Sequence, residues 1–173
     1  RFVRIPLLCG HYLDDPISGP EAVIDQYLVD FALSRRHRLG VHAAEIGSVS
    51  VVLMPRCRED LLRRTGRGAV VVGLGEMGKL TSRAITETVR AGVLRLLLHS
   101  EDRCAETAGS GEAARDQVEL RLASLLIGSN STAHLSPDES VKAVVLGVCE
   151  ANQQFAAGLE SDHKTQTEGA RNP

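Results

Sequence analysis

The sequence predicts an α/β fold with three layers, α/β/α, built around a mixed or mostly parallel sheet. Strand-like apolar runs alternate with longer segments in which apolar residues recur every three or four positions. The inner runs, at 69–72 and 124–128, are almost continuously apolar, as expected for strands that are covered on both faces. The 173 residues are enough to bury roughly 70% of the surface of the unfolded chain, so a substantial core is expected.

The first half of the chain predicts a strand at 2–10 and a loop rich in Asp, Pro and Gly at 11–20. Pro20 suits the first turn of a helix, and one helix is expected from Glu21 to about 35–40. Strands at 48–54 and 69–72 follow, separated by a basic turn. The predicted buried stripe of the helix comprises Val23, Ile24, Tyr27, Leu28, Phe31 and Ala32.

The second half predicts two further helices and a fourth strand, the latter at 118–128. Thr81 is the expected N-cap of the first helix, and Ser136 with Glu139 forms a capping box for the last one. The Gly- and Ala-rich segment 104–115 is expected to be a mobile loop. Residues 1–159 form the predicted domain, and residues 160–173 a polar linker or disordered tail. The buried stripe of the long helix after Thr81 is expected to contain Ile85, Val89, Val93 and Leu96 or Leu97.

Composition limits the partners that this chain is expected to have. A net charge of −2 and an aromatic content of 3% argue against nucleic acid as a partner. No apolar run approaches 18 residues, which argues against a membrane. The four cysteines lie at least 45 residues apart, so reduced thiols and a cytoplasmic location are expected. Because the chain does not begin with Met, we expect it to be part of a longer polypeptide.

The stretch VVVGLGEMGKLT, residues 70–81, allows three interpretations. Gly73, Gly75 and Gly78 match the spacing of a dinucleotide-binding turn, but the helical pattern begins only after the third glycine. The same residues nearly match a phosphate loop, except that Leu80 occupies the position of the Mg²⁺-binding Ser or Thr. A structural turn, in which the glycines allow a tight exit from a buried strand, is the favoured interpretation.

The stretch VVVGLGEMGKLTSRAITETVRAGVLRLL resembles the strand–turn–helix of the N-terminal domain of leucine aminopeptidases, and SPDESVKAVVLGVCEANQQF resembles the helix that closes that domain. The resemblance is closer to a bacterial version of this module found beside CHAT domains, which are caspase-like cysteine protease domains. The patterns DPISGPEAVID and LRLASLLIGSNS…LSPDESVKAVVLGVCEAN carry this second resemblance. It covers most of residues 5–157 and implies a macro-domain-like three-layer fold.

The resemblance implies no peptidase activity. The metal ligands of the aminopeptidases and the His/Cys pair of CHAT proteins belong to other domains, and no residue here matches them. The leading hypothesis is therefore a non-catalytic accessory module of a larger bacterial CHAT-type protein, which binds neighbouring domains or another protein and needs no cofactor or metal. The alternative is a macro-like domain that binds a nucleotide or an ADP-ribose-type ligand.

Candidate sites follow from the glycine turns and the charge pattern. Two turns follow strands and are candidates for holding an anion with backbone amides. The segment 35–67 contains eight arginines but only three carboxylates, which makes it a candidate interaction surface for a negatively charged partner. Cys9 is expected to be a small core residue, and His37 and His42 lack an evident third metal ligand. The candidate anion-binding residues are Gly73, Gly75, Gly78, Gly128, Ser129 and Ser131, and the candidate surface residues, all expected to be exposed, are Arg35, Arg36, Arg63 and Arg64.

Overall fold

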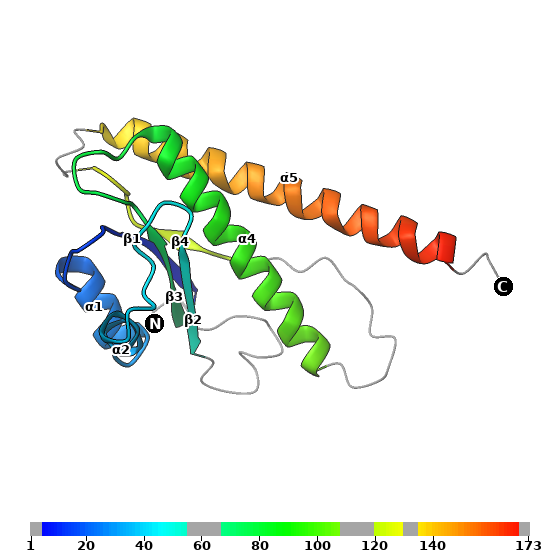
Figure 1. The fold of residues 1–173 in the computed structure, drawn as a ribbon, viewed down its shortest axis with the longest axis horizontal. Coiled ribbons are helices and arrows are strands. Elements are labelled where there is room, and N and C mark those ends of the chain that lie inside the picture. Colours follow the sequence, from blue (N-terminus) through cyan, green and yellow to red (C-terminus); the bar gives the residue numbers. More distant parts are fainter. Residues whose placement is uncertain (1–4, 55–66, 108–119, 130–134, 170–173) are drawn as a thin grey trace.

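The computed structural model describes residues 5–54, 67–107, 120–129 and 135–169. These residues form a small α/β fold, which confirms the predicted fold class (Figure 1). Within this part of the chain, no helix combines the length and apolarity needed to cross a membrane. The elements are β1 (Pro6–His11), α1 (Gly19–Leu28), α2 (Ala32–Arg38), β2 (Val49–Met54), β3 (Arg67–Gly73), α4 (Ser82–Thr107), β4 (Ala123–Ser124) and α5 (Pro137–Gly169).

The four strands form one mixed sheet in the order β2-β3-β1-β4. β1 runs parallel to both β3 and β4, whereas β2 pairs antiparallel with β3. Leu8 at the centre of β1 lies opposite Val70 of β3 on one side and Ser124 of β4 on the other. The carboxyl ends of β1 and β3 therefore meet at the same edge of the sheet, where His11 lies opposite Gly73.

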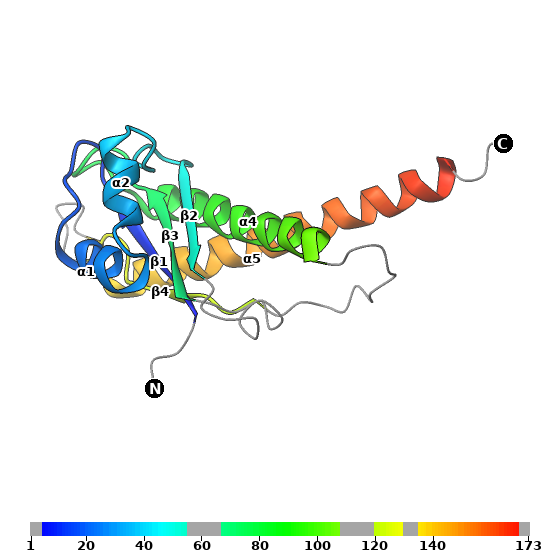
Figure 2. The same cartoon turned by 90° about the horizontal axis from the view of Figure 1, so that it is seen from below.

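Helices cover both faces of the sheet, as the continuous apolar pattern of 69–72 predicts. Val70 and Val72 belong to the core between the sheet and the helices α4 and α5. Ala69 and Val71 point the other way and pack in a second core with α1 and α2. Figures 1 and 2 show the two helix pairs on opposite sides of the strands. The predicted three-layer arrangement is therefore present.

The long helix α4 buries the predicted stripe, with Leu96 rather than Leu97 as its last fully covered member. It packs closely against α5 at Gly147. A Cβ atom there would lie only 2.7 Å from the carbonyl oxygen of Thr86, so the contact requires glycine. The hydroxyl of Thr86 also donates a hydrogen bond to the carbonyl of Ala143, at 3.2 Å. α5 continues to Gly169, past the predicted start of the tail at Glu160, and its end projects beyond the sheet (Figure 1).

Both predicted helix caps are confirmed. The hydroxyl of Thr81 accepts a hydrogen bond from the amide of Ala84 at 3.2 Å. Ser136 and Glu139 form the reciprocal capping box: the Ser136 amide donates to the Glu139 carboxylate at 2.9 Å, and the Glu139 amide donates to the Ser136 hydroxyl at 3.3 Å. These short-range contacts lie within three residues of each other, which is why the sequence alone predicts them.

The predicted single helix from Glu21 is wrong, because the chain breaks into α1 and α2. Asp30 and Phe31 adopt positive φ angles of 51° and 61° between the two helices. The buried carboxylate of Asp25 makes this break possible: it accepts hydrogen bonds from the amides of Leu33 at 2.8 Å and Ser34 at 3.1 Å. The side chain of Asp25 thus does for α2 what an N-cap side chain usually does, because it accepts hydrogen bonds from two first-turn amides that lack a partner within the helix.

The second half departs from the predictions in two places. Only Ala123 and Ser124 of the predicted strand 118–128 pair as β4. Ile127 is buried in the core without ladder pairing, because an apolar pattern marks burial and does not by itself require a sheet partner. The segment 104–107, predicted as the start of a loop, continues α4, and the rest of that loop lies outside the described residues.

Candidate functional site

The first three amides of the glycine turn at 73–78 donate hydrogen bonds to backbone carbonyls of other segments. The amide of Gly73 donates to the carbonyl of Ser48 at 3.0 Å, and that of Gly75 donates to the carbonyl of Ala44 at 2.8 Å. Between them, the Leu74 amide donates to the carbonyl of His11 at 2.9 Å. These three amides are therefore unavailable to a phosphate, and the contacts favour the interpretation of a structural turn.

Steric contacts explain why two of these positions are glycine. A Cβ atom at Gly73 would overlap the carbonyl oxygen of Glu45, so the neighbouring loop can approach only a glycine. Gly75 has a φ of +68° and Gly78 a φ of +85°, which glycine adopts without strain. α4 begins at Ser82, after the third glycine, in contrast to a dinucleotide-binding turn, where the third glycine packs inside the helix.

The second candidate turn lies at the same edge of the sheet as the first. Gly128 has a φ of +78°, and a Cβ atom there would lie 2.9 Å from the side chain of Leu80. Ser129 pairs with Leu135 in an isolated bridge. Ser131 lies outside the described residues. The structure thus places the start of one turn against the end of the other, as the parallel pairing of the strands predicts.

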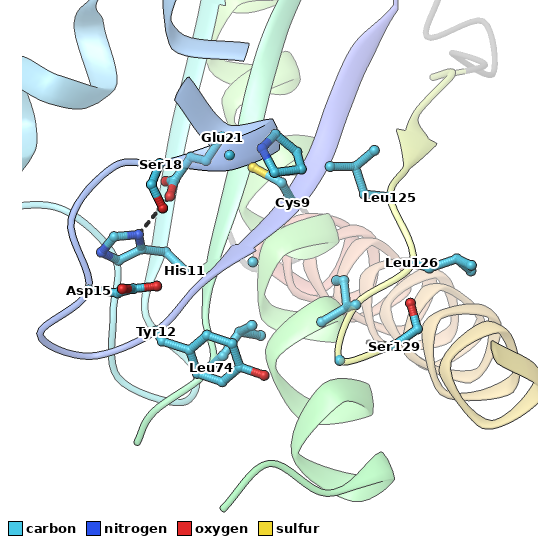
Figure 3. Close-up of a pocket in the computed structure, with 15 residues that line it drawn as sticks. Cys9, His11, Tyr12, Asp15, Ser18, Glu21, Leu74, Leu125, Leu126 and Ser129 are labelled. Atoms are coloured by element: carbon cyan, nitrogen blue, oxygen red, sulfur yellow. Dashed lines mark hydrogen bonds and ion pairs between the residues drawn. The ribbon is translucent and has the colours of Figure 1, made fainter. Parts of the chain in front are cut away.

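A cavity of about 230 Å³ opens at the carboxyl end of β1, between the start of α1 and the segment that follows β4 (Figure 3). Its polar side chains include His11, Tyr12, Asp15 and Glu21, and no Lys or Arg is among the described residues that line it. The hydroxyl of Tyr12 is buried and has no hydrogen-bond partner among the described residues. With two carboxylates and no fixed positive side chain, this lining suits a cation better than a phosphate. The apolar side of the cavity is formed by Leu74, Leu125, Leu126 and Ile127.

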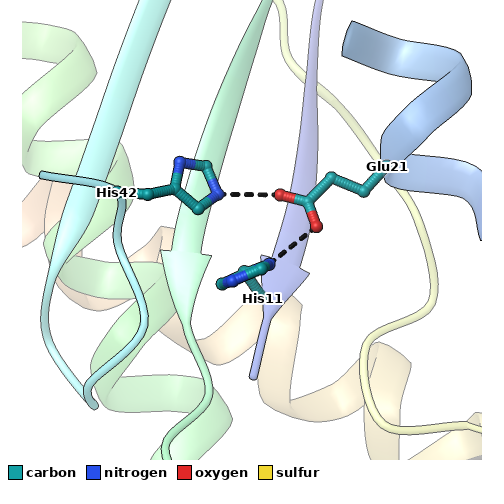
Figure 4. Close-up of side chains that lie close together, drawn as sticks. All are labelled: His11, Glu21 and His42. Atoms are coloured by element: carbon teal, nitrogen blue, oxygen red, sulfur yellow. Dashed lines mark hydrogen bonds and ion pairs between the residues drawn. The ribbon is translucent and has the colours of Figure 1, made fainter. Parts of the chain in front are cut away.

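One wall of the cavity belongs to a cluster of His11, Glu21 and His42 (Figure 4). His11 ends β1, Glu21 lies in the first turn of α1, and His42 lies between α2 and β2. Nδ1 of His11 lies 2.7 Å from one carboxylate oxygen of Glu21, and Nε2 of His42 lies 2.9 Å from the other. The side chains of His42 and Glu21 are only 3% and 9% exposed. Two imidazoles thus hold a buried carboxylate from opposite sides.

The two histidines determine the charge state of Glu21. Burial by itself would raise the pKa of this carboxyl group, but hydrogen bonds from His11 and His42 and the positive charge of their protonated forms act against it. The net effect is a pKa below the usual value of 4.5. Glu21 is therefore ionised at neutral pH, and both imidazoles donate an N–H to it.

Cys9, two residues before His11, is unsuited to act as a nucleophile. Its burial, and secondarily the nearby negative charge of Glu21, raises the pKa of the thiol to about 12. The side chain is therefore protonated at physiological pH, and the thiolate needed for attack is absent. With an exposure of 2%, Cys9 is a core residue, as predicted.

The sequence analysis did not predict the cluster of His11, Glu21 and His42. As metal ligands it considered only His37 and His42, for which it found no third ligand. The ring of His37 lies near the cluster, with its centroid 5.6 Å from that of His11 and 6.1 Å from that of His42. Glu21 comes from another helix, ten residues after His11 and 21 before His42. No local motif has this spacing, so only the packing of α1 against the end of β1 brings the three together.

The predicted basic surface is only partly what the sequence suggested. Arg35 is exposed, as predicted. Arg36 is half-buried and donates a hydrogen bond to the carbonyl of Val51 at 3.2 Å, so the prediction that it is fully exposed is wrong. Burial also lowers the pKa of Arg36. Leu33 of α2 and Val52 of β2 belong to the same core cluster, and this long-range contact is one that charge patterning does not reveal. Arg63 and Arg64 lie outside the described residues.

An exposed apolar face takes the place of the predicted buried stripe. Val23, Tyr27 and Phe31, spaced four residues apart, are 57%, 63% and 57% exposed. Ile24 of the same predicted stripe is buried, because α1 turns only one narrow side toward the sheet. We call these three exposed side chains, Val23 and Tyr27 on α1 and Phe31 in the break that follows it, the α1 face.

The chain has no significant match to a protein-family model or to a curated protein sequence. The resemblance to the N-terminal domain of leucine aminopeptidases and to its CHAT-associated version stays a prediction. Any functional conclusion therefore depends on the local chemistry of the described residues.

Proposed function

We propose that this chain is a non-catalytic accessory module of a larger bacterial CHAT-type protein, and that it binds a protein partner through the α1 face. The partner is a neighbouring domain of the same polypeptide or another protein. The observation that carries the proposal is the exposure of three large apolar side chains close together in the chain, Val23 and Tyr27 on α1 and Phe31 in the break that follows it. Large apolar side chains gathered on one exposed face are typical of interaction sites.

The composition of the face supports binding to a protein. The whole chain contains only two Tyr and three Phe residues, and one of each is among these three exposed side chains. Aromatic side chains contribute a large share of binding energy at protein interfaces, because they bury much surface for little conformational entropy. The partner surface that fits them is an apolar groove.

Exposed arginines on α2 follow Phe31 in the chain. The amide of Arg35 donates to the carbonyl of Phe31 at 3.1 Å, so Arg35 follows Phe31 by one helical turn. Arg35 and Arg38 are both exposed. A partner that carries carboxylates beside its apolar groove would gain from both parts of this surface, and the charged part of the contact would weaken with salt.

The alternative function, binding of a nucleotide or ADP-ribose-type ligand, has less support. The amides of Gly73 and Gly75 already donate to carbonyl groups of the chain. The described lining of the cavity offers Asp15 and Glu21 but no Lys or Arg. A diphosphate would be repelled there, since nothing in the described lining compensates its charge.

Site-specific photo-crosslinking tests the proposal. A benzophenone amino acid replaces Tyr27 in the full-length polypeptide that contains this chain, and a matched variant carries it at Leu146, which is 52% exposed on α5. We expect cross-links from position 27 to a defined acidic and apolar surface, and at least about tenfold fewer from position 146.

Affinity measurements complete this test. Tyr27→Ser combined with Phe31→Ser is expected to weaken binding to the cross-linked partner at least about tenfold, whereas Val145→Ser with Leu146→Ser leaves it unchanged. Equal cross-linking from both positions, or equal affinity of both double variants, would show that the α1 face is not the binding surface.

A further inference from the structure

We infer that His11, Glu21 and His42 form a binding site for one divalent transition-metal ion of the zinc class. One ligand atom from each residue lies within 4.8 Å of the other two. Two imidazoles and one carboxylate are a ligand set that suits zinc, which takes His nitrogen and carboxylate oxygen at about 2.0–2.2 Å. This inference is independent of the α1 face and of the proposed protein partner.

The distances within the cluster are close to those that a shared ion requires. Two ligand atoms on one tetrahedral zinc ion lie roughly 3.3 Å apart, given metal–ligand distances of about 2 Å. The nitrogen–oxygen distances are 2.7 Å from His11 and 2.9 Å from His42. A movement of the carboxylate out of the space between the two imidazoles would make room there for one ion that all three side chains contact.

The charges of the cluster favour a cation. The carboxylate of Glu21 is buried between the imidazoles of His11 and His42, 2.7 Å and 2.9 Å away. The facing cavity adds a second carboxylate, Asp15, to its described lining. Imidazole together with carboxylate favours zinc and similar ions over Mg²⁺ or Ca²⁺, which prefer oxygen alone.

The imidazoles of the chain are concentrated around Glu21. His42 directs Nε2 at the carboxylate, so Nε2 is its ligand atom in the proposed site, and its Nδ1 has no hydrogen-bond partner among the described residues. His37 adds a third imidazole at the edge of the cluster, so half of the six histidines of the chain gather here.

The cavity would give such an ion an open side. His11 and Glu21 both line the cavity, so a water or a ligand can approach two of the three metal ligands from it (Figure 3). Zinc sites with three protein ligands keep a fourth position for water or an exchangeable ligand. The expected occupant of this position is water or a small ligand with a nitrogen, oxygen or sulfur donor.

Titration of the metal-free protein with Zn²⁺ tests the inference. The purified chain is treated with a chelator, dialysed, and titrated by calorimetry. We expect one ion per chain, bound with a dissociation constant in the micromolar range or below, and an increase in Tm on binding. Glu21→Gln and His42→Gln are each expected to weaken binding at least about tenfold. His99→Gln is the matched control, since His99 lies on α4 and outside the cluster.

Cobalt spectroscopy covers the case in which a variant fails to fold. Co²⁺ bound to the wild-type chain by nitrogen and oxygen ligands gives visible absorption bands without the near-ultraviolet charge-transfer band of a thiolate ligand. A thiolate band would assign the metal to cysteine and overturn the inference. So would the absence of Zn²⁺ binding at about 100 μM, or equal binding by wild type and both folded cluster variants. The cluster would then be a structural bridge between β1, α1 and the loop before β2.

Discussion

Glu21 and His11, ten residues apart, join the first turn of α1 to the end of β1 through a hydrogen bond of 2.7 Å. Because the pKa of Glu21 is lowered in the folded chain, its ionised form stabilises the fold. This contribution is complete above the unfolded pKa of about 4.5 and is lost as the pH falls through the lower folded value.

Replacing Glu21 with Gln is therefore expected to reduce the free energy of unfolding in a pH-dependent way. At pH 7 we expect a loss of about 1–3 kcal/mol, because the amide cannot accept a charge-assisted hydrogen bond from both His11 and His42. Chemical denaturation of wild type and variant between pH 7 and pH 3, in the presence of a chelator, measures the difference. A difference that stays constant down to pH 3 would contradict the assigned role of the carboxylate.

The thiols of Cys9 and Cys149 are expected to differ in reactivity. Cys9 is buried and has a pKa of about 12, whereas Cys149 is exposed on α5. Treatment with iodoacetamide at pH 8, followed by peptide mapping, should label Cys149 and leave Cys9 unmodified in the folded protein. In denaturant both should react, and labelling of Cys9 at the rate of Cys149 under native conditions would be inconsistent with its position in the core.

Gly73→Ala is expected to destabilise the fold by at least about 2 kcal/mol, because the added Cβ would overlap the carbonyl of Glu45. Gly158→Ala is the matched control, since no atom of the described residues lies within 4 Å of a Cβ at this position in α5. That substitution should stabilise the protein by roughly 0.5–1 kcal/mol, the usual gain in a helix interior. Thermal or chemical unfolding compares the two, and equal effects would rule out the proposed steric role of Gly73.

Asp25→Ala is expected to cost about 1–3 kcal/mol, because the amides of Leu33 and Ser34 lose their buried acceptor. Asp102→Ala, at an exposed position of α4, should change stability by less than about 0.5 kcal/mol. Hydrogen exchange gives a local readout: the amides at the start of α2 should lose protection in the Asp25 variant. Unchanged protection there would mean that other groups cap the helix.

Nucleotides are expected not to bind at the glycine turn. Addition of ATP or NAD at about 1 mM should leave the Tm unchanged, since a ligand that binds the folded state must raise it. The amides of Gly73, Leu74 and Gly75 are already donated within the chain. A rise of several degrees would reinstate the nucleotide-binding alternative.

Much of the fold follows from local patterns. The stripe of Ile85, Val89 and Val93 and the caps at Thr81 and Ser136 were predicted from the sequence, because each depends on residues three or four positions apart in one helix. The apolar run at 69–72 likewise predicts a strand with two covered faces. Within a single element, the spacing of residues in sequence determines their spacing in space.

Contacts between elements decided the rest. The sequence predicts that Val23, Tyr27 and Phe31 lie in one buried helical stripe, but the packing of α1 and the break after it leave all three exposed. The carboxylate of Asp25 on α1 accepts hydrogen bonds from the amides of Leu33 and Ser34 on α2, across the break between the two helices.

The candidate site depends wholly on contacts between different elements. His11, Glu21 and His42 come from a strand end, a helix start and a loop, and their sequence spacing matches no ligand motif. What the sequence by itself determined was most of the elements, though not the break between α1 and α2, since periodicity encodes which side chains share a face. Which of those faces meet, and so where two imidazoles enclose a carboxylate, depends on the order of the strands and the side on which α1 packs, and these arise only in the folded chain.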